Sequence, residues 1–328
     1  MAQIGNFYFK QDDHVLTSGC SILPGAATIP PIPQAPLHSA VRTRQSNSRL
    51  GIILMLSAMF LFSAADTMAK FLTSTYHPVQ IIWFRQLGLL FGVIILLAMR
   101  GTSILVSRQP KLQITRGVLA VFSSLLFVYA VRYVPLTDAI AASFVAPFFL
   151  TMAGAFILKE PVGIRRWSAV AVGFLGALII IRPGMGVIHP AAMLVVVAAS
   201  LYAARQVIGR LLADTDQTVT TIAYTAITAS LVISIPLPFF FEMPVTLTAW
   251  ALLFGMAVVA AVAEVMVIKA LEVAEAATAA PIHYTLLIWG TFYGYFVFDQ
   301  LPDQWTWIGT AIIVAAGLYT LRRGKAKH

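Results

Sequence analysis

Three charged residues near the start of the hydrophobic part of the chain lie inside apolar runs. Asp66 and Lys70 are four residues apart, a spacing that puts both on one face of a helix. At 1.5 Å per residue, Asp66 is expected about 9 Å below the outer end of a membrane-crossing helix, and Arg85 on the next run about 10 Å below it. Unpaired charges in hydrocarbon are costly, so an Asp66–Arg85 pair is expected, either as a structural ion pair or as part of a substrate or gate site. Lys70, nearer the end, can also extend its ammonium to the membrane surface.

A second charged group is expected toward the other end of the helices. Glu264 and His283 lie about 9–10 Å from the inner ends of their apolar runs, and Arg205 is slightly shallower. A carboxylate beside an imidazole can take up and release a proton, which makes these three residues candidates for proton coupling. The alternative is a Glu264–Arg205 ion pair, with His283 hydrogen-bonded to the backbone.

Aromatic residues on the same runs are candidates for substrate contact. Their rings can stack on an aromatic or cationic group of a substrate, or they can simply pack against neighbouring helices. The candidates for substrate binding are Trp83, Tyr129, Tyr202 and Tyr284.

The sequence carries no enzyme signature. It has no His or acidic cluster with ligand spacing, no glycine-rich phosphate loop and no nucleophile motif, and its single cysteine, Cys20, lies in a polar segment. No metal, cofactor or catalytic residue is therefore expected. An integral-membrane enzyme, such as a lipid-linked transferase, is the alternative to transport, but the acidic or metal cluster that it needs is absent from the sequence.

Apolar residues dominate the elements that carry these side chains. The sequence is 59% hydrophobic and 11% charged, whereas a soluble domain has about 25% charged residues. Apolar runs near the ~20 residues that cross a bilayer follow one another from Leu50 onward. They predict an all-α integral membrane protein with ten transmembrane helices, at residues 50–72, 78–99, 113–133, 136–158, 165–182, 190–210, 218–240, 248–270, 276–298 and 304–322.

The second half of these helices repeats the first at an offset of 140 residues. Identical residues at this offset include Thr151/Thr291, Gly154/Gly294, Trp167/Trp307, Arg182/Arg322 and Gly184/Gly324. The repeats are expected at residues 50–184 and 190–324. Five helices is an odd number, so the second repeat enters the membrane from the opposite side and the two repeats are inverted. Inverted repeats are the plan of many secondary transporters, whose substrate lies between the two halves.

Basic residues predict the orientation. With the N-terminus inside, 18 of the 22 Lys and Arg residues fall on the cytoplasmic side and three outside, as the positive-inside rule requires. Both termini are therefore expected in the cytoplasm. The net charge of +9 then reflects contact with membrane lipids, not with nucleic acid. Residues 1–48 contain a proline-rich stretch and no apolar core, which predicts a disordered cytoplasmic tail.

Several motifs resemble the drug/metabolite transporter superfamily, EamA type. They are FSAADTMAKFL at 62–72, WFRQL at 83–87, AASFVAPFFLTMAGAFILKEP at 141–161 and ATAAPIHYTLLIWGTFYGYFVFDQLPD at 277–303. The acid and lysine of the first, the arginine of the second and the ATAAP of the fourth look closest to the branch that includes S-adenosylmethionine uptake carriers. The resemblance implies a ten-helix bundle whose first, third, fourth, sixth, eighth and ninth helices line a central cavity.

Together these features predict a secondary transporter in the cell (inner) membrane that works by alternating access. The expected substrate is a small polar metabolite, an amino acid or a derivative such as S-adenosylmethionine. Protons or an exchanged metabolite are possible coupling partners. The sequence does not indicate the direction of transport or the oligomeric state.

Overall fold

Helices form all of the regular structure described in this computed structural model, which covers residues 48–157, 163–182, 190–213, 215–273 and 282–324. The expected proline-rich tail, apart from its last residue, and the whole ATAAP segment at 277–281 lie outside these residues. The helices are α1 (Ser48–Leu72), α2 (Pro78–Arg100), η1 (Thr102–Leu105), α3 (Pro110–Val131), α4 (Leu136–Ser143), α5 (Ala146–Phe156), α6 (Ile164–Ile181), α7 (Ala192–Ala213), α8 (Thr218–Ser234), α9 (Leu237–Phe240), α10 (Leu247–Val273), α12 (Thr285–Phe298) and α13 (Gln304–Gly324).

Within the described part of the chain, six segments are long and apolar enough to cross a membrane, over residues 49–72, 78–100, 110–131, 136–156, 192–213 and 247–270. Three more apolar helices are shorter, at Trp167–Ile181, Thr218–Ser234 and Thr285–Phe298. The protein is thus an all-α, multi-pass membrane protein. Six spans pass this criterion, against the ten expected from the sequence.

Two of the expected single helices are interrupted near prolines. The run expected at 136–158 divides into α4 and α5, with Pro147 in the first turn of α5, and the run expected at 218–240 divides into α8 and α9, with Pro238 in the first turn of α9. Proline lacks the amide hydrogen that an uninterrupted helix needs and its ring crowds the preceding turn. A hydrophobic period alone does not show such a break.

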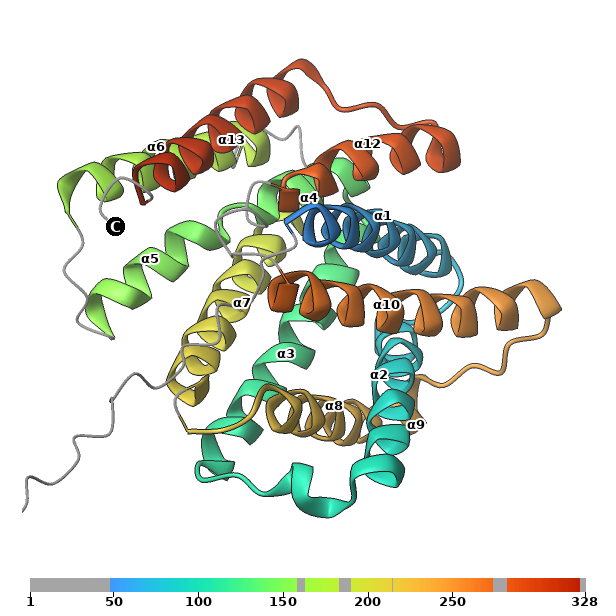
Figure 1. Ribbon diagram of the computed structural model, residues 1–328. Coiled ribbons are helices and arrows are strands. Elements are labelled where there is room, and N and C mark those ends of the chain that lie inside the picture. Colours follow the sequence, from blue (N-terminus) through green and yellow to red (C-terminus); the bar gives the residue numbers. More distant parts are fainter. Residues whose placement is uncertain (1–47, 158–162, 183–189, 214, 274–281, 325–328) are drawn as a thin grey trace, which may run out of the picture. The chain divides into compact units, whose positions relative to one another are not determined.

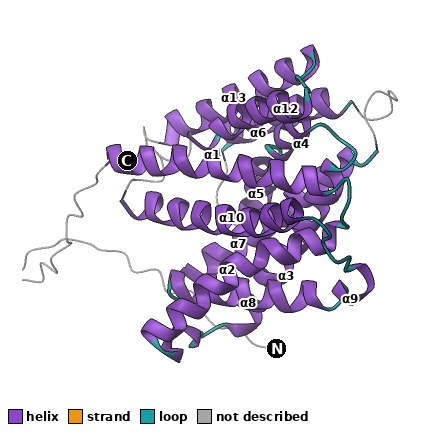
Figure 2. Ribbon diagram, turned by 90° about the vertical axis from the view of Figure 1, so that its right-hand side faces the viewer, coloured by secondary structure: helices purple, strands orange, loops and turns teal. Residues whose placement is uncertain are grey.

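Helices far apart in the sequence pack side by side. Helix α1 lies between α10 and α12, while α3 lies against α7 and α8 (Figure 1). Helix α2 contacts both α8 and α10, which places the first two helices among those of the second half (Figure 2). The charged residues of one half are therefore held next to helices of the other.

Helices α6 and α13 pack closely through glycines. A Cβ at Gly309 would lie 2.5 Å from the carbonyl oxygen of Gly176, and a Cβ at Gly173 would lie 3.7 Å from the side chain of Ala316. Small residues are common where membrane helices approach this closely. The glycines of α6 thus pack against a helix of the same chain, α13.

Candidate functional site

An ion pair joins the first two helices. Nη1 of Arg85 on α2 donates to Oδ1 of Asp66 on α1 over 2.7 Å. The Arg85 side chain is 19% exposed and that of Asp66 11%, so the pair is largely removed from the surface but still accessible. The structure brings together the two residues that the depth argument matched.

Lys70 is engaged inside the bundle. Its Nζ donates to the carbonyl oxygen of Val134, in the turn between α3 and α4, over 2.7 Å, and lies 5.2 Å from the ring centroid of Phe298 on α12. It also interacts electrostatically with Asp138. The ammonium thus links α1 to the turn between α3 and α4, to α4 and to α12, whereas the sequence also allowed it to extend to the membrane surface.

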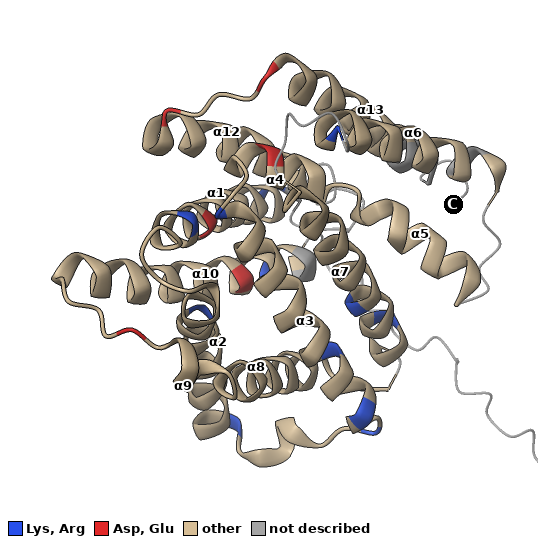
Figure 3. Cartoon of the chain, turned by 180° about the vertical axis from the view of Figure 1, so that it is seen from behind, with Lys and Arg blue, Asp and Glu red and all other residues tan. Residues whose placement is uncertain are grey.

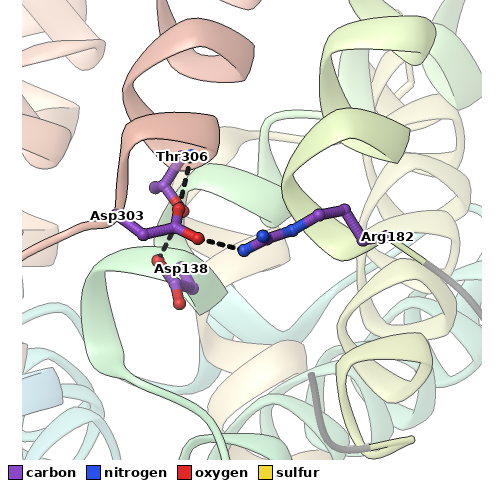
Figure 4. Close-up of polar contacts among 4 residues, drawn as sticks. All are labelled: Asp138, Arg182, Asp303 and Thr306. Atoms are coloured by element: carbon purple, nitrogen blue, oxygen red, sulfur yellow. Dashed lines mark hydrogen bonds and ion pairs between the residues drawn. The ribbon is translucent and has the colours of Figure 1, made fainter. Parts of the chain in front are cut away.

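A polar cluster lies next to this region, between α4, α6 and α13 (Figure 4). The Thr306 hydroxyl donates to Asp138 over 2.9 Å, the Thr306 amide donates to Asp303 over 2.7 Å, and Arg182 forms an ion pair with Asp303. Burial by itself would raise the pKa of the Asp303 carboxyl, but the bonds from Thr306 and Arg182 outweigh it and leave the pKa below its ordinary value. The cluster ties the end of α6 to the start of α13.

A second charged group lies among α3, α7, α8 and α10. Arg116 of α3 donates to the hydroxyl of Thr225 on α8 and interacts electrostatically with Arg205, Glu264 and Tyr202. The Arg205 guanidinium lies 5.0 Å from the ring centroid of Tyr202 on the same helix. Arg116 is one of the 18 basic residues that the charge distribution places on the cytoplasmic side. It lies three residues inside the apolar run expected at 113–133, and the helix that begins at Pro110 places it about two turns from its first residue.

His283 does not join that group in this structure. Its ring lies edge-on to Phe144 at 5.8 Å between ring centroids, and among the described residues it shows no electrostatic interaction with Glu264. Tyr284 stacks on the same phenylalanine at 5.0 Å, and its hydroxyl lies against Gly317 of α13. Both residues therefore contact α4 or α13, not the arginines.

The other aromatic candidates lie in different surroundings. Trp83 donates its Nε1 hydrogen to Ser234 of α8 over 2.9 Å, and Tyr129 lies beside Tyr133 at 5.6 Å between ring centroids. Tyr202 alone among the four candidates contacts a charged candidate, Arg205.

Charged residues are unevenly distributed among the helices. In Figure 3, acidic and basic residues occur on α1, α2, α3, α7 and α10, while α5 and the body of α12 carry none. These five helices pack against one another through the pairs α1–α10, α2–α10, α2–α3 and α3–α7. Helix α4 carries a further acid, Asp138.

A family model describing EamA-like transporters matches the chain twice, over residues 49–182 and 189–322. The chain belongs to the EamA-like transporter family. This membership makes it a membrane transporter, as the sequence resemblance implied, and not the lipid-linked transferase that was the alternative.

Curated relatives in the family carry different substrates. An S-adenosylmethionine uptake transporter of Rickettsia bellii is 29% identical over 275 residues, 83% of this chain and 93% of the relative. A riboflavin transporter of Vibrio cholerae is 30% identical over 80% of this chain and 90% of its own. A pseudopaline exporter of Pseudomonas aeruginosa is 29% identical, covering 84% and 97%. Both uptake and export occur among these names.

A solved crystal structure shares the fold. It matches with a TM-score of 0.58 at 16% identity, covering 83% of this chain and 98% of the other. The likeness extends over nearly all of that chain, so the helical arrangement is common to both.

Proposed function

We propose that this chain is a secondary transporter that moves a zwitterionic amino-acid derivative, such as S-adenosylmethionine, by alternating access. The observation that carries the proposal is the Asp66–Arg85 pair, whose two opposite charges lie inside the first two helices and remain partly accessible. Charged residues within membrane helices commonly mark substrate or ion pathways. Four Rickettsia relatives named as S-adenosylmethionine uptake transporters, at 27–29% identity, support this substrate class.

The charges suit the two ends of an amino acid. A guanidinium binds a carboxylate through two parallel hydrogen bonds, so Arg85 would take the substrate carboxylate. Asp66 would then take the ammonium group. Lys70, one turn from Asp66 and bonded to Val134, adds a positive charge that favours the carboxylate end. Trp83, Tyr129, Tyr202 and Tyr284 remain candidates for contact with the rest of the solute, and Tyr202 has the strongest case because it lies beside a charge.

Helix pairing supports the inverted repeats that alternating access needs. At the 140-residue offset α1 corresponds to α7, α10 to α3 and α2 to α8. The contact between α1 and α10 then has its counterpart in that between α7 and α3, and α2–α10 in α8–α3. Helices α6 and α13 correspond to each other and pack together. This exchange of partners is what a two-fold axis in the membrane plane would produce.

Hydrogen bonds join the two halves at two places, near the first residue of α2 and near the first residue of α8. The Gln80 side chain of α2 donates to the carbonyl of Glu242 over 2.8 Å and accepts from its amide over 2.9 Å. Asp216, just before α8, accepts from Ser107 and from the Arg108 amide, the latter over 2.9 Å. In the proposed topology the hydrogen bonds of Gln80 are extracellular and those of Asp216 are cytoplasmic. Opening of the transporter to either side would therefore require one of these two sets of hydrogen bonds to break.

Glu264 is the best-placed candidate for proton coupling. It lies on α10 and interacts with Arg116, so loss or gain of its charge would change the field on both arginines, Arg116 and Arg205. His283 contacts Phe144 instead, which gives it the weaker case. We place the protein in the cell (inner) membrane with both termini in the cytoplasm, as the distribution of Lys and Arg indicates.

The test is uptake of radiolabelled S-adenosylmethionine into vesicles containing the purified protein, with a pH gradient imposed or absent. S-adenosylhomocysteine, methionine and riboflavin serve as competitors. We expect saturable uptake that S-adenosylhomocysteine inhibits more strongly than riboflavin. Uptake no greater than in protein-free vesicles, or inhibition by riboflavin alone, would overturn the substrate assignment.

A further inference from the structure

Two arginines in the group around α3 and α7 have incomplete hydrogen bonding. Nε of Arg116 and Nε of Arg205 are buried and have no hydrogen-bond acceptor among the described residues. A buried donor left without a partner is costly, more so when it carries charge. Each guanidinium has one neighbouring group that partly compensates, Thr225 for Arg116 and the Tyr202 ring for Arg205.

The local charge is also unbalanced. Arg116 interacts with one other cation, Arg205, and with one carboxylate of the described chain, Glu264. Two positive charges and one negative charge leave an excess of one positive charge in a half-buried setting. Like charges in an apolar environment repel, and the arrangement is stabilised when an anion lies between them.

The outer half of the bundle does not have this imbalance. There Arg85 is paired with Asp66, and Arg182 with Asp303. The 140-residue offset pairs Asp66 with Gln206, a neutral residue whose amide donates to the Tyr202 hydroxyl over 3.2 Å. The same offset pairs Arg85 with Thr225, the residue that accepts from Arg116. Neutral residues therefore replace the Asp66–Arg85 pair in the inner half, and Arg116 and Arg205 have no acid at the position equivalent to Asp66.

Close packing holds Arg116 at this place. A Cβ added at Gly209 of α7 would lie 3.4 Å from Nε of Arg116. Because glycine lacks that carbon, the guanidinium lies directly over the α7 backbone, one turn from Arg205. The arginines of α3 and α7 are therefore positioned by helix packing, not by long flexible side chains at a surface.

We infer that Arg116 and Arg205 form a binding site for a singly charged oxyanion, a carboxylate or a phosphate group, on the cytoplasmic half of the bundle. The oxyanion accepts from the two free Nε–H groups, and Glu264 limits its affinity by repulsion. The anion comes either from a small solute entering from the cytoplasm or from a phospholipid headgroup, which offer the same chemistry. The site is separate from the Asp66–Arg85 pair and does not depend on the identity of the transported metabolite.

Anion-dependent stability of the detergent-purified protein tests the site. The unfolding temperature is measured while acetate or inorganic phosphate replaces chloride at constant ionic strength, and in a second arm while phosphatidylglycerol replaces phosphatidylcholine in mixed micelles. We expect saturable stabilisation, with apparent affinity about tenfold weaker in Arg116→Gln and Arg205→Gln, as loss of a charge-assisted hydrogen bond implies. Arg210→Gln, an exposed arginine on the same helix, is the matched control and should behave as the wild type.

Glu264→Gln provides an independent readout if the arginine variants fail to fold. Removal of the competing carboxylate should strengthen anion binding, opposite to the effect of the arginine variants. Saturation by acetate or phosphate identifies a soluble anion, and stabilisation by phosphatidylglycerol alone identifies a headgroup; either outcome supports the site. Absence of stabilisation in both arms, or equal losses in Arg210→Gln, overturns it. Because transport is not measured, failure of S-adenosylmethionine uptake would leave this result intact.

Discussion

Asp66 and Arg85 form an ion pair of 2.7 Å that joins α1 to α2. They are 19 positions apart in the sequence, and the turn between the two helices, at Thr73–His77, brings their side chains into contact. Each residue compensates a charge that would otherwise be isolated in apolar surroundings. This geometry is compatible with two roles, a structural ion pair or a substrate site in which the two residues part to bind a zwitterion. Mutation of the two residues distinguishes these roles.

Asp66→Ala and Arg85→Ala should each lower stability by about 3–5 kcal/mol, the usual cost of removing one partner of a buried pair, while the double variant recovers much of the loss. If the pair binds substrate, the double variant should be stable but inactive in vesicle uptake. Unfolding temperature and uptake are measured on the same preparations. A stable double variant that still transports would show that the pair is structural only. Single variants with normal stability and uptake would contradict both roles.

Glu264→Gln should flatten the pH dependence of uptake, because the variant can no longer lose or gain a proton beside Arg116. Exchange between loaded vesicles should remain, since it needs no net proton movement. His283→Ala is the comparison, and its contact with Phe144 predicts a pH profile close to that of the wild type. An unchanged profile in Glu264→Gln would remove Glu264 from coupling.

The sequence predicted the helical class and the Asp66–Arg85 ion pair for physical reasons. The thickness of the bilayer sets the length of the apolar runs. An unpaired charge in hydrocarbon is costly, so Asp66 and Arg85 are expected to pair. It did not predict the environment of Arg116 or His283, because both depend on which helix face meets which neighbour. Arg116 resembles a flanking charge in the sequence, but in the fold it is half-buried and packs on Gly209 of α7. Hydrophobic periodicity likewise does not show the breaks near Pro147 and Pro238, for which the prolines themselves are the signal.

Asp216 should confer a pH-dependent stability on the linker between α2 and α3. Burial would raise its pKa, but bonds from Ser107, the Arg108 amide and Gln113 outweigh burial and leave the pKa below its ordinary value. The stabilisation is therefore fully present above the ordinary value of about 3.9 and is lost as pH falls through the lower folded-state pKa. Asp216→Asn should unfold at a lower temperature than the wild type at pH 7, with a smaller difference near pH 3. A difference that is constant with pH would show that the carboxylate charge is irrelevant.

Introduced cysteines test the proposed orientation. Ser74, in the turn between α1 and α2, should react with an impermeant maleimide from outside the cell. Ser103, in η1 between α2 and α3, should react only after permeabilisation. Both residues are exposed, so a difference in labelling reports sidedness and not burial. The reverse pattern would place the N-terminus outside and invert the assignment of both charged groups.

Gly309→Ala should destabilise the contact between α6 and α13, because its new Cβ would lie 2.5 Å from the Gly176 carbonyl oxygen and from the Ile180 side chain. A backbone oxygen cannot turn aside as a flexible side chain does, so the two helices must separate, and overpacking of this kind costs about 1–3 kcal/mol. Gly255→Ala in α10 is the matched control, since nothing lies within 4 Å of its added carbon. Alanine favours a helix over glycine by up to about 1 kcal/mol, so the control should be neutral or more stable. Unfolding temperatures in detergent measure both, and equal effects of the two changes would show that the close approach of Gly176 and Gly309 does not hold these helices together.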